Sequence, residues 1–197
     1  MVGKKVSPTG DQSQVFALVG LLDPDHTARV HQVWKELEVK CGLKAVRVAP
    51  YPHFSFHVAQ QYRLLDLDAS LTDLTRTIQP FTMCTSGLSV FTGQNPVIYI
   101  PVAPSETLLQ LHQTLWEKTS RFGTQLNNYY RPGSWIPHIT LLHDDIDRDC
   151  INCIFDHYLG QTFAWEIKVT QMAVIYQKDG EYGIHKIYPL PGSHHPN

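Results

Sequence analysis

The sequence predicts an α+β fold in which two similar lobes of antiparallel strands and helices surround a central cleft. Three observations support this prediction: short apolar strands occur beside separate helical segments, hairpin turns connect several strands, and one order of elements occurs twice. That order is a helix, a strand that contains a histidine, a second helix and a hairpin. The repetition indicates an internal duplication.

The first half opens with an apolar strand, Val15–Leu22. Asp23 can cap the following helix and Pro24 suits its first position, so we expect a helix to about Lys40 that ends at Gly42. The other elements expected here are strands at Ala45–Val48 and His53–Ala59, a helix at about Asp66–Ile78, and strands at Phe81–Phe91 and Val97–Val102 around a Gly93–Pro96 turn.

The second half follows the same plan. Its expected elements are a helix from Pro104 to about Phe122, a polar link at Asn127–Ser134, a strand at Trp135–Leu142, a helix at about Arg148–Leu159, and strands at Phe163–Gln177 and Tyr182–Leu190. We expect lobes at roughly 11–103 and 104–191, with strands that can be exchanged between them. Lobes of this size are marginal alone, so one domain over 1–197 is expected.

Charge and hydropathy limit the function classes. The net charge is -2 and the sequence pI is about 6.6, so no overall positive field holds a long nucleic acid by counterion release. No apolar stretch approaches the roughly 20 residues that span a bilayer, and Met1–Gly10 precedes no apolar signal segment. We therefore expect a cytoplasmic protein with no membrane partner. Protein partners cannot be inferred from these features.

The cysteines are Cys41, Cys84, Cys150 and Cys153. Four cysteines in a chain of this length do not indicate a disulfide scaffold. Cys150 and Cys153 have the spacing of a redox or zinc pair, but no second pair completes a zinc site. We expect reduced structural thiols and no cofactor.

Two short motifs carry the chemical signal, His53-Phe-Ser55 and His138-Ile-Thr140, each directly after a proline. Strand side chains alternate between faces, so each histidine shares a face with the hydroxyl two residues later. A neutral imidazole can accept a proton and a charged one can donate it, while the hydroxyls can hold phosphate oxygens. Two matched strands therefore predict a shared polar cleft suited to phosphoester cleavage without a metal.

The doubled motif resembles the paired His-x-Thr/Ser-x signatures of the 2H phosphoesterase superfamily, which includes the bacterial 2′-5′ RNA ligase-like proteins and the cyclic phosphodiesterases. The resemblance extends in element order from about Val15 to Leu190. It implies pseudo-twofold lobes, a site in the groove between them, and activity on 2′,3′-cyclic phosphates or 2′-5′ phosphodiester bonds of nucleotides or short RNA ends. It also implies that His53 and His138 are the catalytic acid and base and that Ser55 and Thr140 bind phosphate.

The sequence departs from this family in one respect. Members that act on RNA ends often carry an arginine shortly after a motif, whereas His57 and His143 occupy comparable places here. In regular strands, His57 would share the face of His53, and His143 would face away from His138. Nearby aromatic residues could stack on a base or pack in the core. The candidate substrate-binding residues are His57, Tyr51, Tyr130, Trp135 and His143.

Two other classes of function are consistent with the sequence. One is a nucleotide- or RNA-end-binding module that has the same cleft and no catalysis, which binding without turnover would reveal. The other is a metal site formed by His53, His57 and His138. Histidines four residues apart in a strand lie about 13 Å from each other, so one ion does not easily bridge them.

Overall fold

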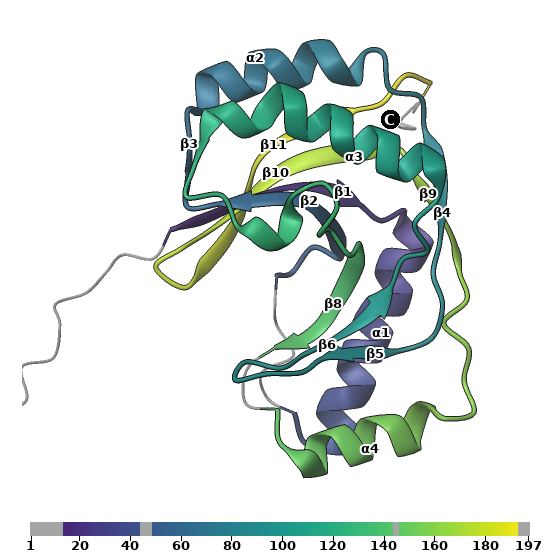
Figure 1. Ribbon diagram of the computed structural model, residues 1–197. Coiled ribbons are helices and arrows are strands. Elements are labelled where there is room, and N and C mark those ends of the chain that lie inside the picture. The colour runs from purple at the N-terminus through teal and green to yellow at the C-terminus, as the bar shows by residue number, and fades with distance from the viewer. Residues whose placement is uncertain (1–13, 44–48, 144–145, 193–197) are drawn as a thin grey trace, which may run out of the picture.

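The computed structural model describes residues 14–43, 49–143 and 146–192 (Figure 1). The strand expected at Ala45–Val48 lies outside these residues. The described elements are β1 Val15–Leu21, α1 Pro24–Cys41, β2 His53–Ala59, β3 Gln61–Tyr62, α2 Leu64–Thr75, β4 Phe81–Cys84, β5 Ser89–Phe91, β6 Val97–Pro101, α3 Glu106–Thr119, η1 Ser120–Phe122, β7 Gly123–Thr124, η2 Asn128–Tyr130, β8 His138–His143, α4 Arg148–Tyr158, β9 Glu166–Val169, β10 Gln171–Lys178 and β11 Glu181–Pro189.

These helices and antiparallel strands confirm the predicted α+β class. The main sheet has seven strands in the order β11-β10-β1-β2-β8-β6-β5, and its two parts meet where β2 pairs with β8. α2 and α3 lie beside the β11-to-β2 part, and α1 and α4 lie beside the β8-to-β5 part (Figure 1). Each spatial group therefore combines elements from both halves of the sequence. The lobe boundary near residue 103 stays a prediction. None of the described helices has the length and apolar character needed to cross a membrane.

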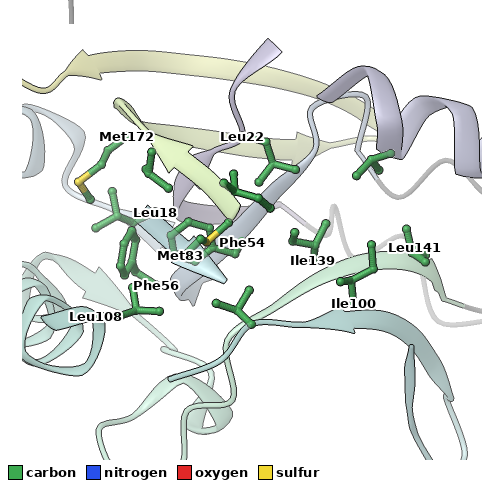
Figure 2. Packing of buried hydrophobic residues seen from close by; sticks show 14 of the residues in the cluster. Leu18, Leu22, Phe54, Phe56, Met83, Ile100, Leu108, Ile139, Leu141 and Met172 are labelled. Atoms are coloured by element: carbon green, nitrogen blue, oxygen red, sulfur yellow. The ribbon is translucent and has the colours of Figure 1, made fainter. Parts of the chain in front are cut away.

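One hydrophobic cluster connects all four helices to the sheet. The buried faces of the helices contribute to it together with alternate residues of β2 and β8, which include Phe54, Phe56, Ile139 and Leu141. Figure 2 shows these four side chains among Leu18, Met83, Ile100 and Leu108. Because the helices and these residues occupy one face of the sheet, the histidines and hydroxyls that alternate with them face the other side.

Two of the expected strands are divided in the structure. The segment predicted as one strand at Phe81–Phe91 forms β4 and β5, and the segment at Phe163–Gln177 forms β9 and β10. β4 pairs with β9 in a separate two-stranded sheet, whereas β5 and β10 belong to the main sheet. Gly87, with φ of 66°, lies in the first interruption. A continuous β-forming sequence does not reveal where a strand changes partner.

A β-bulge interrupts the alternation of β2. On β1, Leu18 pairs with His57 and the next residue, Val19, pairs with Ser55, so Phe56 is the extra residue. A bulge of this kind lets two consecutive side chains point to the same face. Phe56 and His57 are accordingly both buried.

β8 contains a bulge at the equivalent place. Ile98 of β6 pairs with Leu142 and Tyr99 pairs with Thr140, so Leu141 is the extra residue. Leu141 and Leu142 are both buried. In each strand the bulge follows the first residue, a histidine, by three positions. The two strands therefore share a backbone irregularity as well as a motif.

A disulfide corrects the expectation of reduced thiols. Cys41 at the end of α1 is bonded to Cys153 in α4. The two residues are 112 positions apart in sequence, and only the packing of α1 against α4 brings them together. Spacing along the chain contains no sign of such a contact. Cys84 and Cys150 are not disulfide-bonded.

We expect reduction of this disulfide to destabilise the protein, because closing a loop of this length restricts the unfolded chain. The free energy of unfolding should fall by about 2–4 kcal/mol on adding a reductant or in Cys41→Ser. Denaturant unfolding with and without reductant measures it, and Cys84→Ser, which leaves the bond intact, is the matched control. Equal stability of the wild type under both conditions would contradict the prediction.

Candidate active site

A cavity of about 320 Å³ lies on the histidine face of the main sheet, where β2 meets β8. His53, Ser55, His138 and Thr140 all line it. Continuing the central β2–β8 register by one residue in each direction places His53 across from Thr140 and His138 across from Ser55. Each histidine thus has one hydroxyl on its own strand and another on the facing strand.

Main-chain carbonyls orient both histidine rings. Nδ1 of His53 lies 2.5 Å from the carbonyl oxygen of Tyr51, and Nδ1 of His138 lies 2.7 Å from that of Ile136. A carbonyl only accepts, so Nδ1 must carry the hydrogen in both rings. Nε2 is then the nitrogen left to exchange a proton with a ligand. In both motifs, one proline lies between the histidine and the residue whose carbonyl oxygen accepts its hydrogen bond.

Burial lowers the pKa of both histidines. For His53, the cost of desolvating the charged ring dominates, the hydrogen bond to Tyr51 opposes it, and a charge on His138 lowers the pKa further. For His138, desolvation again dominates over the opposing hydrogen bond to Ile136. Because a charge on one ring disfavours a charge on the other, the state in which both rings are charged is disfavoured.

Tyr130 and His143 complete this part of the cavity wall. The Tyr130 hydroxyl is hydrogen-bonded to the Ser55 side chain, and burial raises the pKa of Tyr130. His143 was expected to face away from His138, and this expectation is wrong. The extra residue at Leu141 shifts the alternation of β8, so His143 lines the same cavity as His138.

The expectation for His57 is also wrong, because His57 does not share the face of His53. The bulge turns it into the core, where Nδ1 lies 2.5 Å from the Tyr62 hydroxyl and Nε2 lies 2.7 Å from Oγ1 of Thr119. Burial lowers the pKa of His57 to about 3, so its ring is neutral at physiological pH. Its partners and its burial give it a structural role.

Tyr51 and Trp135 support the site from outside the main cavity. Tyr51 supplies the carbonyl that orients His53, and it lines a small void beside His53 and Thr140. Trp135 is buried, and its Nε1 donates to the carbonyl oxygen of Ser55 at 2.9 Å. Both aromatic residues therefore position the β2 motif.

His112 in α3 is a positioning residue that sequence reasoning missed. Its ring stacks on Trp135 with centroids 3.9 Å apart. Its Nε2 lies 3.1 Å from the carbonyl oxygen of Phe56 and 3.0 Å from that of Tyr130. One buried imidazole thus connects the bulge of β2 to the segment that supplies Tyr130. The sequence predicts the helix that carries His112, but no motif there marks this residue.

The C-terminal hairpin contributes a further wall that the sequence did not predict, through Tyr176, Gln177 and Tyr182. These residues reach the cavity because β10 pairs with β1. None of the described lining residues is a lysine or arginine, so the positive charge they offer comes from histidines. No cluster of three or more potential metal ligands occurs in the described part of the chain.

The chain resembles one known protein family and a set of solved structures. The family model of the 2′-5′ RNA ligase superfamily matches residues 23–181. TT0787 of Thermus thermophilus is 20% identical with a TM-score of 0.62, covering 91% of this chain and 100% of that chain. E. coli LigT complexed with 3′-AMP is 18% identical with a TM-score of 0.60, covering 92% and 99%. LigT complexed with phosphate is 17% identical with a TM-score of 0.57, covering 91% and 99%. No curated protein matches the chain.

At these identities, the structural neighbours show that the fold is shared. The family match is broader evidence, because it spans most of the chain and includes both motif strands, β2 and β8. The chain therefore belongs to the 2′-5′ RNA ligase superfamily, a superfamily of phosphoesterases.

Proposed function

We propose that the protein is a metal-independent phosphodiesterase that acts on 2′,3′-cyclic phosphates or 2′-5′ phosphodiester bonds of nucleotides or RNA ends. The matched pair of histidines carries this proposal: each ring is held at Nδ1 by a carbonyl, and both line one cavity with two hydroxyls. The neighbouring fold of LigT has been solved with 3′-AMP and with phosphate, which supports a nucleotide as the ligand. Because β2 and β8 each supply half of the site, the chain acts as one domain.

Hydrolysis of a cyclic phosphate illustrates the chemistry. The neutral histidine takes a proton from water, whose oxygen forms a new bond to phosphorus. The bond from phosphorus to one ribose oxygen breaks, and the charged histidine protonates that oxygen. Ser55 and Thr140 donate hydrogen bonds to the non-bridging oxygens as charge develops there. General acid–base catalysis by each histidine is worth about 10²–10⁴-fold.

We expect His53→Ala and His138→Ala each to reduce turnover of a 2′,3′-cyclic mononucleotide by at least about 10²-fold, because each removes one proton-transfer group. Ser55→Ala and Thr140→Ala should slow turnover through weaker stabilisation of the transition state. Turnover is measured in a chelator, with thermal unfolding to confirm folding and with His185→Ala, which lies on β11 and lines no part of the cavity, as the control.

Near-normal turnover in either histidine variant would contradict the paired mechanism. Nucleotide binding by the wild type without hydrolysis of cyclic or 2′-5′ substrates would instead identify a binding module.

The lowered pKa values of His53 and His138 predict an acidic optimum. Turnover needs one charged and one neutral ring, so it falls at high pH where both are neutral and at low pH where both are charged. Since burial lowers both pKa values below 6.5, the maximum of kcat/KM should lie below pH 6.5. A bound phosphate anion favours the charged rings, so the maximum of kcat should lie at higher pH. A pH series of initial rates tests this, and a kcat/KM maximum above pH 7 would refute it.

A further inference from the structure

A small void of about 10 Å³ adjoins the main cavity where α1 approaches the two motif strands. The void and the main cavity share Ala49, His53 and Thr140 as lining residues. Nε2 of His31 in α1 lies 3.3 Å from the carbonyl oxygen of Pro50, so α1 contacts the segment that leads into β2. The residues that line the void are Trp34 of α1, Ala49, Tyr51, Pro52, His53 and Thr140.

Trp34, on the wall of this void, has an unpaired hydrogen-bond donor. Its Nε1 is buried and has no hydrogen-bond partner among the described residues. An indole N–H can only donate, and a buried donor without an acceptor is unfavourable. Buried polar groups in folded proteins are generally paired with another protein group or with an ordered water. We therefore looked for an acceptor on the side of Trp34 that faces the motif strands.

The two motif hydroxyls differ in how the protein orients them. The Ser55 side chain is hydrogen-bonded to the hydroxyl of Tyr130. Thr140 has the equivalent place on β8, two residues after His138, but its side chain forms no hydrogen bond within the described residues. A hydroxyl stabilises the charge that develops on a phosphate oxygen only when its hydrogen points there. Thr140 therefore lacks the orienting partner that Ser55 has.

One water molecule would pair both groups. A void needs about 10–15 Å³ to hold a water, and the water needs at least about two polar partners. We infer that a water binds in this void, where it accepts a hydrogen bond from Nε1 of Trp34 and donates one to Oγ1 of Thr140.

Trp34 is then a positioning residue that acts on the reaction through Thr140. Because the Thr140 oxygen accepts from the water, its own hydrogen is directed to a phosphate oxygen. The water has the same role for Thr140 as Tyr130 has for Ser55. This inference rests on the proposed function, since the phosphate is the ligand that Thr140 holds.

The water is tested directly by NMR, without a substrate. In protein with isotope-labelled tryptophan, the Nε1–H signal of Trp34 is identified by its loss in Trp34→Phe. This hydrogen should show a cross-peak to a bound water. The cross-peak should weaken in Thr140→Val, which removes the hydroxyl and keeps the shape of the side chain. The Nε1–H of Trp135, which donates to the Ser55 carbonyl, is the internal control and should show no such cross-peak. Absence of the cross-peak at Trp34 would overturn the inference.

Turnover of a 2′,3′-cyclic mononucleotide tests the route through Thr140. Trp34→Phe keeps an aromatic ring and removes the donor, so it should lower kcat by about tenfold and leave KM unchanged. In a Thr140→Val background the same substitution should have no further effect, whereas in a Ser55→Ala background it should still cost about tenfold. Equal losses in all three backgrounds would identify a purely structural role for Trp34 and overturn the inference.

Trp165→Phe is the matched control. It makes the same substitution at a buried tryptophan that packs against Phe163 and lines neither the main cavity nor the void. This variant should keep the kcat of the wild type, and thermal unfolding confirms that each variant folds.

The two readouts separate this inference from the proposed function. If the wild type hydrolyses no cyclic or 2′-5′ substrate, the proposed function fails, and the cross-peak alone decides whether a water joins Trp34 to Thr140. If substrates are cleaved but the cross-peak is absent, or if the loss in Trp34→Phe is independent of Thr140, the inference fails alone.

Discussion

The antiparallel pairing of β2 with β8 is the contact on which the site depends. This pairing joins two parts of the sheet that pack against different helices. Among the described residues, Phe54 of β2 pairs with Ile139 of β8. Both side chains are fully buried in the common core, so packing on one face sets the separation of the histidines on the other. Closely packed interiors resist small displacements, so the core holds the two histidine rings at a fixed separation.

The two bulges give β2 and β8 similar backbones. The side chains at equivalent positions of the two strands nevertheless differ in polarity. At the position after the bulge pair, β2 presents Val58 and β8 presents His143. One buried position differs in the opposite sense, since His57 on β2 corresponds to Leu142 on β8. Two similar strands therefore place an apolar side chain at one part of the cavity wall and an imidazole at the equivalent part.

The sequence predicted the fold class and the grouping of the four motif residues, because alternation in a strand is reliable over two residues. It failed beyond the bulges, where His57 and His143 exchange their expected faces, since one extra residue reverses every later side chain. The Cys41–Cys153 bond and the hairpin wall at Tyr176 were out of reach for another reason. Both depend on which distant elements become neighbours, and neither leaves a local pattern.

The orientation of both motif histidines by main-chain carbonyls has a consequence for how the site can vary. A side-chain acceptor can be lost by one substitution, whereas the carbonyls of Tyr51 and Ile136 persist whatever side chain stands there. A following proline restricts each of these residues to extended conformations, which keeps the carbonyl in place. The strand geometry therefore fixes the tautomer in which Nδ1 carries the hydrogen. Surrounding side chains can therefore change while Nδ1 of each ring keeps its hydrogen and Nε2 stays the nitrogen that faces a ligand.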